Sequence, residues 1–153
     1  MLRIGGAVND PTIEQICGTS PDLAAMLAEA QLPTDDLAEP GRRFFRFAEG
    51  GRTIGFIGWE AGDGTNALLR SAVVAPGRRG NGEGSQIIRW ALARLAELGV
   101  TDAWMLTSTM EALALRLGFA RADRARAPET IRRSRQFSHL CPSTAVLFHR
   151  RLP

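Results

Sequence analysis

The glycine-rich stretch "PGRRGNGEGS", from Pro76 to Ser85, is the part of the sequence best suited to chemistry. It follows the apolar run "ALLRSAVV" and precedes a stretch with helical periodicity, so it predicts a loop between a strand and a helix. Glycines lack a Cβ atom, so successive backbone N–H groups of such a loop can turn toward one anion. The positive end of the following helix and a nearby arginine add to the attraction. We therefore expect this loop to bind a phosphate-bearing ligand.

The spacing of the loop separates three kinds of phosphate site. A P-loop ends in Gly-Lys-Ser/Thr, and the chain has no lysine, since all 19 of its basic residues are arginine. In the dinucleotide pattern G-x-G-x-x-G the third glycine falls on Ser85, and Asp102, near the distance of a ribose-binding acid, begins its strand instead of ending it. The order Arg79, Gly82, Gly84 fits R/Q-x-x-G-x-G/A, a pattern for the pyrophosphate of coenzyme A.

With this loop in a strand-loop-helix setting, the chain resembles the GNAT superfamily of acetyltransferases over roughly residues 12 to 152. The stretch "EALALRLGF" (111–119) is similar to a later helix of that family, which usually ends in L-G-F. The resemblance implies acetyl-CoA as co-substrate, with its diphosphate on the loop and its pantetheine arm along the preceding strand, where an N–H would polarise the thioester carbonyl. The implied cofactor contacts are Ala72, Val73, Val74, Arg78, Arg79, Gly80, Asn81, Gly82, Glu83, Gly84 and Ser85.

Acetyl transfer needs a neutral amine placed against the thioester, stabilisation of the oxyanion and a proton for the departing thiolate. Many relatives carry a tyrosine four residues before the glycine of L-G-F, but that position is Ala114 and the chain has no tyrosine, so the proton donor is unassigned. By spacing, an asparagine of the family falls near Thr107, and Thr107 and Ser108 offer hydroxyls there. Glu60, at the end of its strand, is the candidate base, acting through water, and a solvated strand-end acid is the alternative interpretation.

Three further stretches indicate which class of amine accepts the acetyl group. "PTDDL", "LTST" and "APETIRRSRQFSHLCPSTAV" resemble the acetyltransferases associated with arsenic-resistance operons, and the last is more distantly similar to the acetyltransferase domain of bacterial N-acetylglutamate synthase. Both resemblances imply a glutamate-like amino acid, or a toxic analogue with arsenic or phosphinate, acetylated at its α-amine. The candidate clamp for its acidic groups consists of Arg70, Arg132, Arg133 and Arg135, although a solvated basic face would also explain them.

Composition and charge limit which other functions the sequence can support. A net charge of +3 does not imply nucleic-acid affinity, and the arginine-rich segment after Arg116 has few aromatics and is interrupted by acids. An arginine-rich nucleic-acid-binding domain is therefore the weaker alternative, and a non-catalytic CoA-binding module, suggested by the missing tyrosine, is the other. Cys17, Cys141, His139 and His149 lack the spacing of metal ligands, so we expect no metal.

No apolar run reaches membrane-spanning length, and the first residues are too short and too weakly flanked for a secretory signal. We expect a cytoplasmic protein with a small-molecule amine as its partner and neither nucleic acid nor membrane. The resemblance also leaves room for a homodimer formed through the late strands.

Periodicity and turn residues predict the elements that position these side chains. The expected strands cover 12–17, 43–49, 52–60, 67–74, 102–107, 119–124 and 143–152. The expected helices are 22–30 after an N-cap at Ser20 and Pro21, one from near Ser85 to Gly99, one opened by a Ser108–Glu111 capping box and closed by Gly118, and a short one starting at Pro128 and Glu129.

This order predicts an α+β protein with the GNAT fold. Its sheet would be mixed and mostly antiparallel, with about six to seven strands splayed at the middle and three to four flanking helices. We expect a single domain over residues 12–153, preceded by an N-terminal extension over 1–11, that transfers the acetyl group directly without a metal or a covalent acyl-enzyme.

Overall fold

The computed structural model describes residues 11–137 and 145–153. Residues 1–10 of the expected extension, and Cys141 and His139, lie outside the described residues. Seven strands form one sheet in the order β1-β2-β3-β4-β5-β7-β6. They are β1 (Thr12–Ile16), β2 (Arg42–Glu49), β3 (Arg52–Ala61), β4 (Asn66–Val74), β5 (Asp102–Thr107), β6 (Ala120–Arg121) and β7 (Val146–Arg151). The helices are α1 (Pro21–Glu29), α2 (Glu83–Glu97), α3 (Glu111–Arg116) and α4 (Glu129–Arg132).

The expected mixed sheet is confirmed. Strands β1 to β4 form an antiparallel meander, β4 and β5 pair in parallel, and β7 lies antiparallel between β5 and β6. Among the described residues, only the β4–β5 connection is a crossover between parallel strands, and α2 provides it. The glycine-rich loop therefore lies at the one place where a strand leads through a helix to its parallel neighbour.

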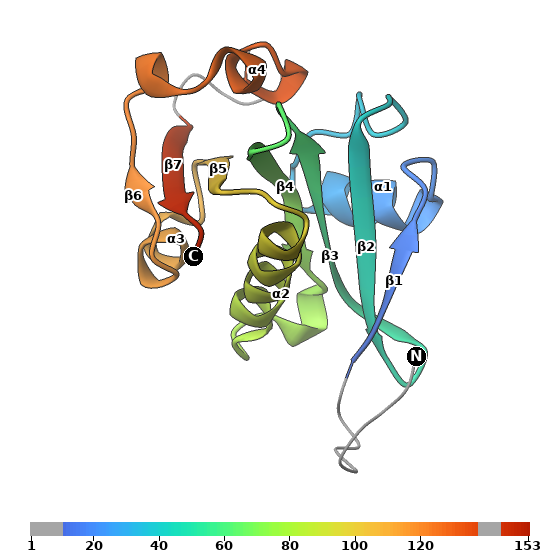
Figure 1. Ribbon diagram of the computed structural model, residues 1–153. Helices are drawn as coiled ribbons and strands as arrows, with labels where there is room; N and C mark the ends of the chain where they lie inside the picture. Colours follow the sequence, from blue (N-terminus) through green and yellow to red (C-terminus); the bar gives the residue numbers. More distant parts are fainter. Residues whose placement is uncertain (1–10, 138–144) are drawn as a thin grey trace.

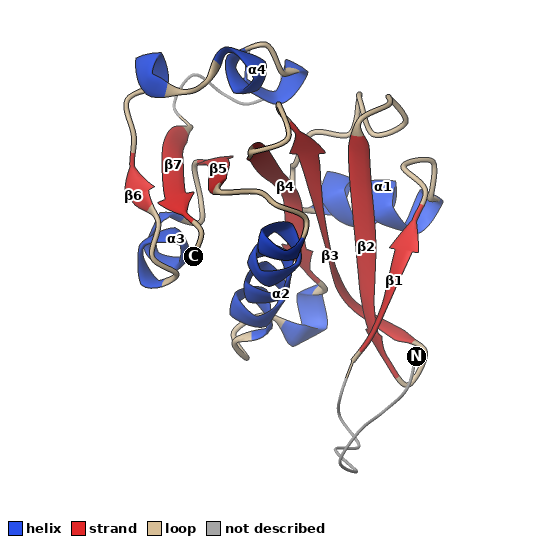
Figure 2. Cartoon of the chain, in the orientation of Figure 1, coloured by secondary structure: helices blue, strands red, loops and turns tan. Residues whose placement is uncertain are grey.

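Helices cover both faces of the sheet, as Figure 2 shows with α2 in front of the strands and α1 behind them. Neighbouring residues of one strand divide between the two faces, because side chains alternate along a strand. Phe45 and Trp59 pack in the core that contains the buried residues of α2, whereas Phe44 packs with Leu23 and Leu27 of α1. Helix α3 shares the α2 face through Ala114, while α4 packs on the other face around Leu68 and Trp104. Figure 1 shows where these helices lie along the sheet.

Strand β3 contains glycines where its neighbours approach closely. A Cβ atom on Gly55 would lie 2.2 Å from the backbone oxygen of Val73, and one on Gly58 would lie 2.5 Å from the ring of Phe44. Side chains larger than hydrogen are therefore excluded at both positions, and β4 can pack tightly against β3 just where the site is formed.

The elements after β5 differ most from the expectation. Strand β6 has two residues instead of the six predicted over 119–124, because the carboxylate of Asp123 accepts the backbone N–H of Ala125 and turns the chain into a short 3₁₀ helix at Arg124–Arg126. The Ser108–Glu111 capping box is wrong as well. The hydroxyl of Thr107 accepts the N–H groups of Thr109 and Met110 instead, at 3.1 and 2.9 Å.

Within the described residues, no helix is both long and apolar enough to cross a membrane.

Candidate functional site

The site begins where β4 and β5 separate. The two strands pair from Asn66↔Asp102 to Leu69↔Met105, and then β5 continues its pairing with β7 up to Thr107↔Val146. Among the described residues, the segment of β4 from 70 to 74 has no strand on the β5 side. The predicted splay at the middle of the sheet is therefore present, and it leaves a free strand edge that can accept another extended chain.

A β-bulge lies at the start of this free edge. The β3–β4 register runs from Phe56↔Val73 to Gly58↔Arg70, so both Ser71 and Ala72 lie opposite Ile57. Ser71 has φ 58°, a left-handed conformation that is uncommon outside glycine. The extra residue shifts the alternation of side chains, so Ala72 packs on the α2 face and Val73 on the α1 face. The sequence analysis did not foresee the bulge, because nothing in "LLRSAVV" marks it.

The bulge also decides which backbone groups face the gap. The N–H of Ala75 donates to the carbonyl of Ile54 at 2.7 Å, so Ala75 and Val73 direct their backbone groups toward β3. Since backbone groups alternate sides along a strand, those of Val74 and Ala72 face away from β3, into the gap. Of the three residues predicted to contact a pantetheine arm, Ala72 and Val74 therefore present their N–H groups, and Val73 does not.

The glycine-rich loop joins this edge to α2. The chain makes one 3₁₀ turn at Pro76–Arg78, and Gly80 and Gly82 then take positive φ values of 89° and 78°. Gly82 is the N-cap, and α2 begins at Glu83, two residues before the predicted start at Ser85. Since the first N–H groups of a helix have no partner within the helix, the loop and the first turn of α2 offer them to an anion.

Gly84, Val74 and Leu113 lie close together beside the loop. An added Cβ atom on Gly84 would lie 3.6 Å from both Val74 of β4 and Leu113 of α3. The free edge, the start of α2 and one face of α3 therefore converge. Ala114, which occupies the tyrosine position of the resemblance, is 1% exposed in the core next to Leu113.

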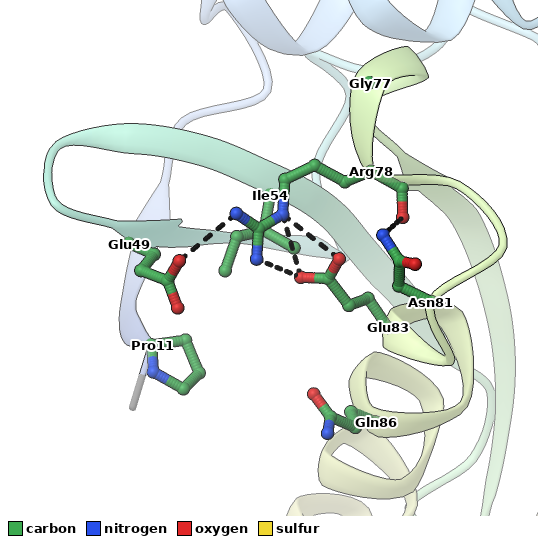
Figure 3. A pocket seen from close by; sticks show the side chains of 8 residues that line it. All are labelled: Pro11, Glu49, Ile54, Gly77, Arg78, Asn81, Glu83 and Gln86. Carbon is green, nitrogen blue, oxygen red and sulfur yellow. Dashed lines mark hydrogen bonds and ion pairs between the residues drawn. The ribbon is translucent and has the colours of Figure 1, made fainter. Parts of the chain in front are cut away.

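The side chain of Arg78 extends toward Glu49 at the end of β2 and Glu83 at the start of α2 (Figure 3). Its guanidinium lies between Glu83 and Glu49, with N–O distances of 2.6 and 3.2 Å. The hydrogen bonds to Glu83 and then to Glu49 raise the pKa of Arg78 above its ordinary value. These residues line an open cavity of about 430 Å³ together with Gln86 and Pro11, on the side of β2 and β3. Arg78 and Glu83 thus form an ion pair where the loop joins α2, and Gly77 and Asn81 of the loop line the same cavity.

Arg79 lies along the free strand edge. Its Nε donates to the carbonyl oxygen of Val74 at 2.9 Å, and its guanidinium pairs with Glu29 at the end of α1, at 3.1 Å. Both side chains are about half exposed, so this pair can exchange for another partner at little cost. Asn81 stabilises the loop from within, because its side-chain amide donates to the carbonyl of Arg78 at 3.3 Å.

A buried charge cluster lies on the α1 face, directly before the bulge. Arg70 has a fully buried side chain that bonds both oxygens of Asp36, at 2.6 and 2.7 Å, and Glu60 at 2.8 Å. Arg42 of β2 contacts the same Oδ2 of Asp36 at 2.9 and 3.0 Å. Burial works to raise the pKa of Asp36, but the hydrogen bonds and charge of Arg70, followed by those of Arg42, lower it below its ordinary value.

This cluster places two of the predicted site residues together. Arg70 and Glu60 were expected to bind substrate and to act as base, respectively, and they are partners of each other. The guanidinium of Arg70 is enclosed by the cluster, so it does not reach solvent as a carboxylate clamp would. The sequence analysis missed Asp36 and Arg42, although the two acids of "PTDDL" were the available signal.

The other predicted arginines lie in and after α4. Arg132 is exposed, and so is Arg133, the C-cap residue of α4, which pairs with Glu129 at 2.8 Å. Arg135 pairs with Glu39, which in turn lies 3.7 Å from Arg42. The chain of contacts therefore brings Arg135 to the rim of the charge cluster and leaves Arg132 and Arg133 outside it.

Thr107 and Ser108 lie at the mouth of the gap, at the end of β5. The hydroxyl oxygen of Thr107 accepts two backbone N–H groups, which leaves its own hydrogen to donate. Ser108 is exposed.

The sequence of residues 12–119 matches the family model described as Acetyltransferase (GNAT) family. The matched part covers well over half of the chain and includes β4, the glycine-rich loop and α2. No curated protein matches the sequence.

Solved structures share this fold at low sequence identity. N-acetylglutamate synthase from Neisseria gonorrhoeae, complexed with coenzyme A and L-arginine, aligns with a TM-score of 0.75 and 18% identity over 94% of this chain and 34% of that chain. The chain thus spans about one third of that synthase. A Mycobacterium tuberculosis protein in complex with CoA and NLQ aligns with a TM-score of 0.73 and 16% identity over 94% of this chain and 100% of its own. IAA acetyltransferase from Bacillus cereus aligns with a TM-score of 0.66 and 16% identity over 94% of this chain and 100% of its own.

Proposed function

Because the chain belongs to the acetyltransferase (GNAT) family, whose enzymes use acetyl-CoA as co-substrate, we propose that it acetylates the amine of a small amino acid or amino-acid analogue by direct transfer. The observation that carries this proposal is the gap between β4 and β5, which opens beside the glycine-rich loop and the start of α2. One extended ligand with a diphosphate at one end fits both features: the backbone amides of 80–85 would hold the diphosphate, and the edge at Ala72 and Val74 would hold the pantetheine arm.

The reaction joins the amine nitrogen to the thioester carbon and breaks the carbon–sulfur bond, and the proton lost by the amine balances the charge of the departing thiolate. An N–H at Ala72 or Val74 would donate to the carbonyl oxygen as negative charge develops on it. Glu60 would take the amine proton through water, which requires one of its oxygens to leave the arginines around it. Because position 114 is alanine, we propose that the hydroxyl group of Thr107 or Ser108 donates a hydrogen bond or the proton to the departing thiolate.

We further propose a glutamate-like acceptor, including analogues that carry arsenic or phosphinate. The stretches 33–37, 106–109 and 127–146 support it through their resemblance to arsenic-resistance acetyltransferases, and the fold likeness to N-acetylglutamate synthase is compatible with it. The acidic groups of such an acceptor would be bound by Arg132, Arg133 or Arg135, since Arg70 is enclosed by carboxylates.

The test has two stages. Calorimetry with acetyl-CoA should give one binding event, and release of free thiol should then depend on an added amine from a panel of L-glutamate, L-aspartate and their phosphinic and arsonic analogues, with mass spectrometry of the acetylated product. Binding without thiol release for any amine would indicate a non-catalytic CoA-binding module. Absence of binding, together with a shift of random DNA at physiological salt, would favour the nucleic-acid alternative.

A further inference from the structure

The buried charge cluster meets the free edge of β4 at Arg70 itself and at its neighbour, the bulge residue Ser71. The Nε of Arg70 donates to the hydroxyl oxygen of Ser71 at 3.1 Å, while its two terminal nitrogens bond Asp36 and Glu60. One guanidinium therefore connects the bulge to the loop before β2, through Asp36, and to β3, through Glu60. All three of its nitrogens are used.

The position of Ser71 needs such support. A left-handed backbone at a residue other than glycine persists only where the surroundings determine it strongly. Ser71 is 7% exposed, and on the β5 side no described strand pairs with the residues that follow it. The β3 ladder, whose register breaks at this point, supports the bulge from one side. The side chain of Arg70 supports it through the bond to the Ser71 hydroxyl, and its guanidinium lies 5.7 Å from the centre of the Phe44 ring.

We propose that Asp36 is a positioning residue for acetyl transfer: through Arg70 it fixes the bulge at Ser71, and thereby aims the N–H groups of Ala72 and Val74 into the gap. This inference rests on the proposed function, because those amides matter only if a thioester carbonyl lies against them. Asp36 itself reaches neither substrate. Its bidentate contact with Arg70 sets the rotation of the planar guanidinium, and that rotation sets where the Nε hydrogen meets Ser71.

The chain offers a matched control. Arg42 binds the same carboxylate oxygen of Asp36 but comes from β2, and its other polar contacts among the described residues are with Pro40, Glu39 and Glu60. Arg42→Gln removes a guanidinium from Asp36 while the Asp36–Arg70–Ser71 connection remains. Asp36→Asn breaks that connection at the carboxylate. Ser71→Ala removes the hydroxyl that accepts the Nε hydrogen of Arg70, and it disturbs the buried charges less than Asp36→Asn does.

The experiment measures the carbonyl stretch of acetyl-CoA by isotope-edited infrared spectroscopy on the full-length protein, with no acceptor present. Wild-type protein and Arg42→Gln should lower the carbonyl frequency equally, because a backbone N–H polarises the bond. Asp36→Asn and Ser71→Ala should bind acetyl-CoA with unchanged affinity but lose most of this shift. With an amine that supports turnover, their kcat should fall about ten- to hundred-fold while KM for acetyl-CoA stays constant, since the contact matters in the transition state.

A folded Asp36→Asn variant with the wild-type carbonyl frequency would overturn the proposal, and so would an equal loss in Arg42→Gln. If Asp36→Asn does not fold, Ser71→Ala decides in the same way. If wild-type protein lowers the carbonyl frequency but acetylates no amine of the panel, the proposed acceptor fails while the positioning role of Asp36 is still decided by the variants. If wild-type protein does not bind acetyl-CoA at all, both proposals fall together.

Discussion

At the scale of single residues, Asp36 combines full burial with a negative charge, which is costly unless the charge is paired. Arg70 and Arg42 supply that pairing, and they lie 34 and 6 residues away in the chain. No spacing rule connects such positions, so the second acid of "PTDDL" looked like an ordinary loop residue in the sequence. The same distance along the chain hides the partner of Arg70, which the sequence suggested as part of a clamp for the acidic groups of a glutamate-like substrate.

The lowered pKa of Asp36 makes a prediction about acid stability. A carboxylate whose pKa in the folded protein lies below the ordinary 3.8 stabilises the fold fully above that value. The contribution falls as pH drops from 3.8 through the folded pKa, because the unfolded chain binds the proton first. Urea denaturation between pH 3 and pH 6 should therefore show wild-type stability declining below about pH 4 more steeply than that of Asp36→Asn. Parallel curves for the two proteins would contradict the pairing of Asp36.

At the scale of elements, the loop and α2 act as one unit, and Gly82 is where they join. The sequence predicted the strand, the loop and the helix in their correct order, because glycines and apolar periodicity are local signals. It placed the start of α2 two residues late, because Gly84 is a weak helix former and extends the glycine-rich pattern, whereas the positive φ of Gly82 leads directly into the first turn at Glu83. The phosphate role of Arg78 stays a prediction, and in the structure its guanidinium pairs with Glu49 and Glu83, which lie on different elements.

Gly82 gives a charge-specific test of the loop. No atom lies within 4 Å of a Cβ built on Gly82, so a side chain there has space, and asparagine tolerates its left-handed backbone. Gly82→Asn and Gly82→Asp differ chiefly in charge. If the loop holds the diphosphate, Gly82→Asp should bind acetyl-CoA about ten-fold or more weakly than Gly82→Asn at low salt, and the difference should shrink as salt is added.

Calorimetric titrations of both variants over a range of ionic strength would measure this. Equal affinity of the two variants for acetyl-CoA would show that the diphosphate lies elsewhere.

At the scale of the whole molecule, the sheet has two parts, β1 to β4 and β5 to β7, joined by four parallel residue pairs. That ladder is short, but one hydrophobic core runs across it. Residues of β2 and β3, such as Phe45 and Trp59, belong to the same cluster as Met105 of β5 and Phe148 of β7, with α2 packed against them. We therefore propose that residues 12–153 form one domain, as the sequence analysis expected.

One domain should unfold in one step. Trp59 and Trp90 report on the first part of the sheet and Trp104 on the second. Two variants separate these signals: one retains only Trp104, the other only Trp59 and Trp90, and each has phenylalanine at the remaining tryptophan positions. In each variant, the urea midpoint measured by fluorescence should agree with the midpoint measured by far-UV circular dichroism. Fluorescence midpoints that depart from the circular dichroism, with one part unfolding first, would instead make the β4–β5 gap a boundary between two folding units.

The sequence by itself determined the order and type of the elements around the loop, the exclusion of lysine and tyrosine chemistry, and the family resemblance, because each depends on residues that are near one another in the chain or on composition alone. Only the tertiary structure decided which amides of β4 face the gap, that Arg70 is enclosed by Asp36 and Glu60, and that Arg78 is paired with Glu49 and Glu83. Those facts depend on a bulge and on ion pairs between distant elements, and a charged side chain takes its partner from whatever the fold brings within a few ångströms.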